Sequence, residues 1–491
     1  MISDIHRAVP LSAATLGELD PRVGVPAYNR SELTASIVHI GVGGFHRAHL
    51  ATYADELAAR GHTEWGIVGS GIMPSDKRMA EVLAAQDGLY TLITRGGQAT
   101  SVHVVGSILD YILAAGDSEP LVARIADPAT RIVSLTVTEG GYPVNEKEAR
   151  FDSTLALAGP ESAFGIIVAA LGRRRELGLG PLTVMSCDNV IANGEVTRLA
   201  VVGVAEARDA SLARWIDENV TFPNGMVDRI TPATTDADRA FLVEEYGVRD
   251  GWPVVTEPFR QWVIEDAFVA GRPPWEELDI TVTADVEPYE LMKLRLLNAG
   301  HSSIAYLAAL AGIELVDEAM REPLISRFLG RFLEDEAGPV LPDIPRIDVP
   351  AYQASLIERF SNPAIGDQIS RLCLDGSAKF PKFLLPTIRK QLQEGGPVTL
   401  SALALAGWCS YLVGIADDRS PIELAADPDL ANARALAAES LSDPARFLSY
   451  RRVFGDDLAG NARFRNEFVD ALSKLRSSGV RATLAAALNG V

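Results

Sequence analysis

The feature that most constrains the fold is a change of pattern at about residue 285. Before that point, short apolar and β-branched runs alternate with longer helical patterns. Several runs are apolar throughout, as buried parallel strands are. We predict strands at residues 36–40, 65–68, 90–94, 131–137, 182–186, 252–256 and 280–283. Because helical patterns separate them, they predict βαβ crossovers and a doubly wound α/β sheet with insertions.

After residue 285 the strand pattern almost disappears, and helical patterns fill the rest of the chain. We predict helices at residues 288–311, 325–336, 352–360, 365–372, 400–415, 432–441 and 464–478. A chain of 491 residues is too long for a single compact core. The sequence therefore predicts an α/β domain over residues 1–285 and a mainly α-helical domain over residues 286–491.

The composition disfavours several classes of partner. The formal net charge is -20, so the chain repels nucleic acid and anionic lipid. Its three cysteines, Cys187, Cys373 and Cys409, are far apart and lack C-x-x-C spacing, which indicates reduced thiols. The first residues have no secretory pattern, and the apolar stretch 402–416 is too short to span a bilayer. We expect a cytoplasmic protein with no nucleic-acid or membrane partner.

A glycine-rich turn follows the first long predicted strand and opens a helix. Gly41 and Gly43 allow a tight turn and a close approach to a pyrophosphate, and Gly44 and Phe45 begin a helix whose free N–H groups face that anion. The pattern is G-x-G-G, with His46 in the third glycine position of the usual motif. A turn of this kind predicts a dinucleotide site, although a strand-to-helix turn without a ligand has the same pattern.

An acidic residue after the second strand is expected to bind the adenosine ribose. Asp76 is the candidate, and a carboxylate there favours NAD over NADP. Lys77 and Arg78 beside it could accept the additional phosphate of NADP, so NADP stays possible. Asp76 also suits a helix N-cap, since a helical pattern follows it.

The helical pattern at residues 288–311 is apolar over most of its circumference, which predicts a buried helix. It nevertheless carries four polar residues, Glu290, Lys293, Asn298 and His301, within an arc of roughly 140° on an ideal α-helix. Taken singly, Lys293 suits a surface lysine and His301 a core histidine. Together they indicate a polar face that a hydroxyl-rich substrate can satisfy. Gly300 on the same helix indicates a close approach by another group.

These residue types suit hydride transfer from an alcohol. The reaction needs a base for the hydroxyl proton, and a lysine serves when burial lowers its pKa. It also needs donors to the developing alkoxide, which amides from Asn298 and from the Asp188-Asn189 pair can supply. Close histidine pairs occur only in and before the glycine turn, with no Cys/His/carboxylate set beside them, so we expect no metal.

Six motifs are similar to those of the polyol-specific long-chain dehydrogenase/reductase family. They lie at residues 41–49, 138–142, 186–189, 222–231, 293–301 and 375–383, and the resemblance runs from about Val25 to the C-terminus. It implies a Rossmann-type N-terminal domain, a mainly α-helical C-terminal domain, and metal-independent, NAD-linked oxidation of a polyol. The closest branch oxidises D-mannitol at C2 to D-fructose, reversibly.

The resemblance also implies roles for individual residues. Lys293 is implied as the general base, with Asn189 and Asn298 as alkoxide donors and Glu290 as the link for proton exchange with solvent. Substrate hydroxyls are assigned to His301, Asp228, Arg371 and Lys379. Coenzyme contacts are assigned to Gly41, Gly43, Gly44, Phe45, Asp76 and Glu139. Ser75 stands where close family members often have Glu, a departure that leaves strict NAD preference open.

Other activities remain open at this point. D-arabinitol or sorbitol is an alternative substrate, and a fructuronate or tagaturonate reductase of the same family would use Arg371 for the sugar-acid carboxylate. A nucleotide-binding sensor without turnover would keep the glycine turn but not the polar helix face. We expect a monomer that acts on a small polyol or ketose.

Overall fold

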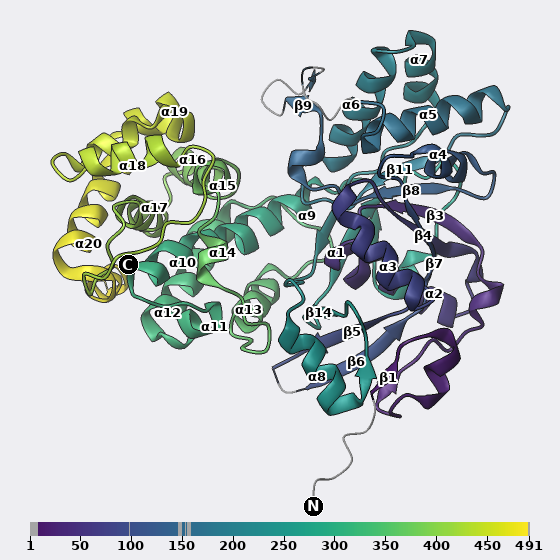
Figure 1. Cartoon of the computed structure of the whole chain (residues 1–491). Coiled ribbons are helices and arrows are strands. Elements are labelled where there is room, and N and C mark those ends of the chain that lie inside the picture. Colours follow the sequence, from purple (N-terminus) through teal and green to yellow (C-terminus); the bar gives the residue numbers. More distant parts are fainter. Residues whose placement is uncertain (1–7, 98, 146–149, 153, 155–158, 490–491) are drawn as a thin grey trace, which may run out of the picture. The chain divides into compact units, whose positions relative to one another are not determined.

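The computed structural model describes residues 8–97, 99–145, 150–152, 154 and 159–489, apart from the side chain of Glu139 (Figure 1). The chain divides into two compact units, Met1–Glu287 and Pro288–Val491. No helix within the described residues is long and apolar enough to cross a membrane.

The first unit is built on a five-stranded parallel sheet in the order β11-β8-β3-β4-β7. Its strands are β3 (Ala35–Ile40), β4 (Gly66–Gly71), β7 (Ile108–Leu113), β8 (Ile132–Leu135) and β11 (Thr183–Ser186). The chain adds strands on one side of β3 and then on the other, so the order switches between β3 and β8. Ligands of doubly wound folds bind at the carboxyl edge beside such a switch point.

Helices cover both faces of this sheet. They are α1 (Gly44–Ala48), α2 (Leu50–Ala59), α3 (Lys77–Ala85), α4 (Glu119–Ala126), α5 (Ala163–Glu176), α6 (Asn193–Glu206) and α7 (Ala210–Asn219). Residues of α4, α5 and α6 pack with Val38 and Val133 in one core cluster, whereas residues of α1 and α2 pack with Ile37 and Ile67 in another. A sheet buried on both faces explains why its strands are apolar runs.

Smaller sheets carry the remaining strands. One sheet joins β14 (Val254–Thr256), β5 (Tyr90–Arg95), β6 (Thr100–Val105) and β2 (Val23–Gly24), and another joins β12 (Gly225–Asp228), β15 (Gln261–Glu265) and β16 (Thr281–Thr283). Helix α8 (Asp236–Tyr246) packs in a separate core cluster with residues of β2, β5, β6 and β14. Two short pairs are β1 (Val9–Pro10) with β13 (Val248–Arg249) and β9 (Val144–Asn145) with β10 (Arg150–Phe151). The runs predicted at residues 90–94, 252–256 and 280–283 are strands, but they lie outside the central sheet.

In its described part the second unit consists of helices. They are α9 (Glu287–Met292), α10 (Ala299–Leu310), α11 (Val316–Arg321), α12 (Pro323–Arg331), α13 (Val349–Phe360), α14 (Ile369–Leu372), α15 (Gly376–Phe383), α16 (Leu385–Glu394), α17 (Thr399–Tyr411), α18 (Leu430–Glu439), α19 (Arg451–Gly460) and α20 (Ala462–Asn489). The buried α17 packs against α10 and α20. The apolar stretch near residue 402 is therefore core.

Two predicted helices contain π-helical turns. Residues Lys293–Asn298 join α9 to α10, and residues Phe332–Ala337 follow α12. The prediction of a helix from residue 365 was wrong in its first half, because α14 begins only at Ile369. The run at residues 379–383, which suits a packed turn by sequence, is helical within α15 and contains Pro381.

Candidate functional site

The glycine turn connects β3 to α1 at the carboxyl edge of the central sheet. Gly41 has φ 95°, and a Cβ there would lie 2.1 Å from the carbonyl oxygen of Thr136. The N–H of Gly43 donates to the carbonyl of Gly41 at 2.8 Å, and a Cβ on Gly43 would meet no atom closer than 3.9 Å. Glycine is thus required at position 41 by the chain itself. At Gly43 the space beside the backbone is open to a ligand.

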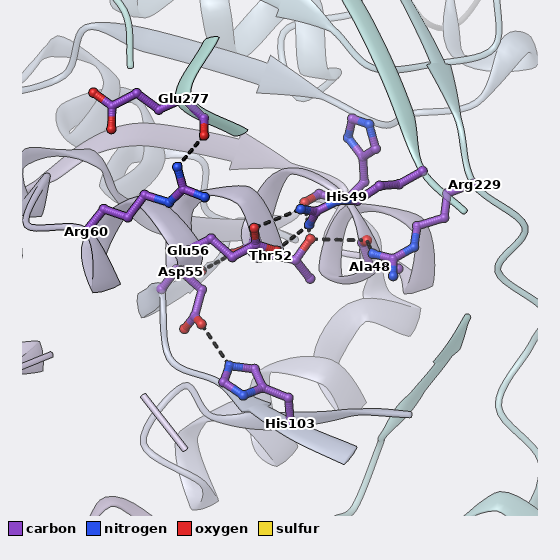
Figure 2. Close-up of polar contacts among 12 residues, drawn as sticks. Ala48, His49, Thr52, Asp55, Glu56, Arg60, His103, Arg229 and Glu277 are labelled. Atoms are coloured by element: carbon purple, nitrogen blue, oxygen red, sulfur yellow. Dashed lines mark hydrogen bonds and ion pairs between the residues drawn. The ribbon is translucent and has the colours of Figure 1, made fainter. Parts of the chain in front are cut away.

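Buried arginines fix the helices that follow this turn. Arg47 donates to the carbonyl of Gly43 at 3.3 Å and to that of Trp252, and Tyr90 donates to the carbonyl of Arg47 at 2.6 Å. Arg229 donates to the carbonyl of Ala48, as Figure 2 shows. Asp228 and Arg229 are both buried, so they do not form an ion pair on the surface.

Helix α2 is tied to the same unit along its length. Asp55 accepts a hydrogen bond from His103 at 2.9 Å, and Arg60 donates to the carbonyl of Glu277 (Figure 2). Glu56 accepts from Arg260 at 2.8 Å. These contacts come from three different parts of the unit, so the position of the helices after the glycine turn is determined by tertiary contacts as well as by the turn.

Histidines fill the space beneath the turn. His39 lies 2.7 Å from the hydroxyl of Ser134 and 2.9 Å from that of Thr136, and its ring stacks on His46 with centroids 3.4 Å apart. Burial lowers the pKa of His39 to about 3 and lowers the pKa of His46 as well. Both rings are therefore neutral packing groups at pH 7. Among the described residues, no three His, Cys, Asp or Glu side chains gather as a metal site.

Asp76 lies in the turn between β4 and α3. Its carboxylate accepts the N–H of Met73 at 2.9 Å in the preceding 3-10 turn. As the N-cap residue of α3 it makes no side-chain cap hydrogen bond, so the interpretation as a cap of the following helix was wrong. A Cβ on Gly71 would lie 2.3 Å from the Cβ of Asp76, so Gly71 leaves room for this side chain. Lys77 pairs with Glu81 at 3.8 Å. The guanidinium of Arg78 lies over the ring of Trp252 at 4.8 Å. Both basic side chains thus have partners in this structure.

The loops after β8 and β11 meet at Asp188. Its carboxylate accepts the N–H groups of Val137 at 3.0 Å and Thr138 at 2.8 Å. Asn189, the predicted alkoxide donor, follows it and is exposed, whereas Asp228 is buried at the end of β12. The side chain of Glu139, a predicted coenzyme contact, lies outside the described residues. These contacts of Asp188 could not be predicted from the sequence, because Val137 and Thr138 lie on a distant segment of the chain.

The predicted polar face of the second unit lies on and beside a π-helical segment. Lys293 is 8% exposed, and Glu290, Asn298 and His301 are partly exposed. The N–H of Ala299 donates to the carbonyl of Leu294, the i→i+5 pattern of a π-helix. This register brings residues five apart, such as Lys293 and Asn298, toward the same side. The arc of roughly 140° was calculated for a regular α-helix, and this segment has a different register, which α-helical periodicity cannot reveal.

Residues of neighbouring helices contact the first turn of α10, which follows the π-helical segment. The ring of His301 stacks on Phe360 with centroids 3.9 Å apart. A Cβ on Gly300 would lie 3.3 Å from Leu329, so the close approach indicated by this glycine is made at least by another helix of the same unit.

Arg371 and Lys379 lie on separate short helices of the second unit. Arg371 is exposed, and its guanidinium binds Asp367 through two hydrogen bonds, one of them 2.6 Å long. Lys379 is partly exposed on α15. That helix packs closely, because a Cβ on Gly376 would lie 2.4 Å from the hydroxyl of Tyr306. Arg371 and Asp367 are four residues apart, a spacing in the sequence from which this pairing could have been predicted.

Known proteins match both units. The model of the mannitol dehydrogenase Rossmann domain matches residues 35–277, and that of the mannitol dehydrogenase C-terminal domain matches residues 285–476. This chain belongs to the mannitol dehydrogenase family. Mannitol 2-dehydrogenase from Aspergillus fumigatus is 43% identical over 482 residues, which cover 95% of this chain and 96% of that protein.

Two solved structures are similar over almost the whole chain. Mannitol 2-dehydrogenase from Pseudomonas fluorescens, in a ternary complex with NAD and D-mannitol, has a TM-score of 0.88 and 41% identity, covering 98% of this chain and 100% of that one. A substrate-free D-sorbitol dehydrogenase has a TM-score of 0.90 and 36% identity, covering 96% of this chain and 100% of that one. The predicted family and the Rossmann-type fold with a mainly helical second domain are confirmed.

Proposed function

We propose that this chain catalyses the reversible, NAD-dependent oxidation of D-mannitol to D-fructose without a metal. The observation that carries the proposal is Lys293, an amine that is 8% exposed and lies on a π-helical segment with Asn298. The relative that binds NAD and D-mannitol supports the choice of substrate and coenzyme. The open side of Gly43 fits the close approach of a pyrophosphate.

In the proposed reaction, neutral Lys293 accepts the proton of the substrate hydroxyl as the carbon is oxidised. Bound NAD supplies the hydride acceptor. Asn189 and Asn298 donate to the oxygen while it carries negative charge, which stabilises the alkoxide more than the neutral alcohol. Glu290 then passes the proton to solvent. The remaining hydroxyls are held by Asp228, His301, Arg371 and Lys379.

The coenzyme-binding residues are proposed to be Gly41, Gly43, Gly44, Phe45, Asp76 and Glu139. NAD is the expected coenzyme, because the carboxylate of Asp76 would repel the additional phosphate of NADP. We also propose that the chain is a cytoplasmic monomer and divides into its domains at about residue 285. Cys187, Cys373 and Cys409 are free and buried, which fits a reducing compartment.

Specific observations bear on two alternative activities, sorbitol oxidation and sugar-acid reduction. The similarity to a D-sorbitol dehydrogenase favours sorbitol as the second substrate to test. A sugar-acid reductase would need a cation for the substrate carboxylate, but the guanidinium of Arg371 is bound by Asp367. Neutral polyols therefore suit this chain better than sugar acids.

A substrate panel tests the proposal. Initial rates would be measured for mannitol, sorbitol and arabinitol with NAD and with NADP, and for fructose and fructuronate with NADH. We expect the highest kcat/KM for mannitol with NAD, and fructose reduced faster than fructuronate. Faster reduction of fructuronate would move the chain to the sugar-acid branch. Tight binding of NADH without turnover of any substrate would support a sensor.

A further inference from the structure

We propose that Asp188 is a positioning residue that holds the loop after β8 against the loop after β11. It would set the backbone at Thr138, on the coenzyme side of the sheet, and the place of Asn189. The proposal rests on the proposed function only for the role of Asn189. The sheet topology alone brings both loops to the carboxyl edge beside the switch point.

We call Asp188 and its three hydrogen-bond donors the clamp. The carboxylate of Asp188 accepts all three hydrogen bonds. Besides the N–H groups of Val137 and Thr138, it accepts the hydroxyl of Tyr142 at 2.7 Å. The residue is 7% exposed. A buried carboxylate whose oxygens accept three hydrogen bonds is poorly placed to take a substrate proton, so its effect on the reaction must pass through the groups that it holds.

The held backbone is strained at Thr138. Its φ is 68° and its ψ is 162°, a region that residues with a Cβ rarely adopt and that is least accessible to a β-branched residue. Such a conformation persists only where neighbouring groups enforce it. The hydrogen bond from the N–H of Thr138 to Asp188 is 2.8 Å long and joins the strained residue directly to the clamp.

The clamp itself is fixed from the other side. The N–H of Asp188 donates to the hydroxyl of Ser186 at 3.1 Å, and its carbonyl accepts the amide of Asn193 at 3.2 Å. That amide also donates to the carbonyl of Gly225 at 2.7 Å, at the start of β12. Asp188 therefore links the strained loop to two strand ends. Asn189 is bonded directly to this fixed residue.

Asp250 offers a matched control. It is likewise a buried carboxylate that accepts a backbone N–H at 2.6 Å and a hydroxyl at 2.7 Å, both from Thr91. The carboxylate of Asp250 also accepts the side-chain amide of Gln86 at 3.0 Å and the N–H of Trp252 at 2.8 Å. Thr91 lies on β5, which belongs to another sheet. Asp188→Asn and Asp250→Asn thus remove similar charges from similar surroundings, and only one of them touches the loops at the carboxyl edge.

The test measures kcat for mannitol, the Kd of NADH and the Tm of both variants, with rates taken well below each Tm. We expect Asp188→Asn to lower kcat at least 20-fold and weaken NADH binding at least fivefold. Asp250→Asn should lower Tm comparably and leave both values within twofold. Equal effects of the two variants on kcat and on NADH binding would overturn the proposal, because they would show a purely structural role.

A double-mutant cycle tests the link to Thr138. Glycine adopts the strained conformation without a clamp, so Asp188→Asn should cost less than fourfold in kcat in the Thr138→Gly background. An undiminished 20-fold loss there would contradict the mechanism. If Asp188→Asn does not fold, Tyr142→Phe removes one donor from the same carboxylate and should lower kcat at least threefold, whereas an unchanged kcat would refute the clamp.

The NADH measurement separates the two proposals. If the wild-type protein oxidises no polyol, the proposed function fails. Weaker NADH binding in Asp188→Asn than in Asp250→Asn would still support the clamp. If the wild-type protein oxidises mannitol and the two variants behave alike, the clamp fails and the proposed function stands.

Discussion

The glycine turn of the first unit and the lysine segment of the second are positioned by different physics. At Gly41, the positive φ favours glycine and the carbonyl of Thr136, from the loop after β8, excludes a Cβ, so the requirement is visible in the sequence as a glycine. At Lys293–Asn298, the same residues could form an α-helix or a π-helix, and the register decides which side chains share a side. The comparison teaches that the glycine turn can be recognised from its residue types, whereas residue types do not specify the side chains that share a face of the lysine segment.

The largest expected effect lies in the lysine segment. Lys293→Ala should lower kcat/KM for mannitol at least about 10³-fold, since no other group would accept the proton, while the Kd of NADH stays within twofold. Steady-state kinetics and NADH fluorescence measure the two quantities. Lys390→Ala is the control, because Lys390 lies on α16 and pairs with Glu394 at 2.7 Å. A similar loss of kcat/KM in Lys293→Ala and Lys390→Ala would show that the effect is not specific to the lysine segment.

Substitutions in the glycine turn should change the free energy of unfolding and the binding of NADH. Gly41→Ala forces a methyl group against Thr136 and should lower the free energy of unfolding by about 3 kcal/mol as well as weaken NADH binding. Gly43→Ala has space for its methyl group and should cost less than about 1 kcal/mol, yet weaken NADH binding at least tenfold, because the pyrophosphate approaches there. Urea unfolding and NADH titration measure both. Unchanged NADH binding in Gly43→Ala would argue against a ligand at the turn.

Acid should destabilise the packing beneath the turn. Burial lowers the pKa of His39 from its ordinary value of 6.5 to about 3, so between these pH values the unfolded chain binds a proton that the folded chain does not. The stability that this difference supplies is complete above pH 6.5. It falls by about 1.4 kcal/mol per pH unit as the pH drops toward the folded pKa. Urea unfolding at several pH values between 7 and 5 gives the free energy of unfolding as a function of pH. We expect this free energy to fall less steeply with decreasing pH in His39→Gln than in the wild-type protein. An equal pH dependence would exclude His39 as the source.

The smallest effect concerns coenzyme choice. Asp76→Ala should shift the ratio of kcat/KM values for NAD and NADP about tenfold toward NADP, because a negative charge is lost. Asp76→Asn keeps an oxygen that can accept the N–H of Met73 but loses the charge. The same shift in both variants would identify the charge as the cause. A shift in the alanine variant alone would identify the hydrogen bond from Met73 as the cause.

Much of the first unit could be predicted from the sequence. Its buried strands are apolar runs, and the glycine turn follows one of them, so β3, β4, β8 and β11 were found within a few residues. Strand β7 was missed because Asp110 interrupts a run that is only partly buried. The strands at residues 90–94 and 252–256 were found but not their sheet, since pairing between distant segments leaves no local pattern.

The site was harder to predict than the fold. Residue type made Lys293, Asn298 and His301 candidates, because polar groups on an apolar helix are conspicuous. The π-helical register of residues 293–298 could not be predicted, since an apolar pattern with helical spacing does not distinguish it from an α-helix. Asp188 was named for the alkoxide site, but its hydrogen bonds to the loop after β8 could not be predicted, because only the folded chain brings these segments together. The pairing of Arg371 with Asp367 could have been predicted from their spacing of four residues.

The central claim is that the amine of Lys293 takes the substrate proton, and the pH dependence of kcat/KM tests it most directly. For mannitol oxidation by the wild-type protein, we predict that kcat/KM falls tenfold per pH unit below one ionisation. In Lys293→Ala the residual rate should lose this dependence, and added methylamine should restore part of the rate as its neutral form becomes available. A variant that retains the wild-type profile and ignores the amine would contradict the account.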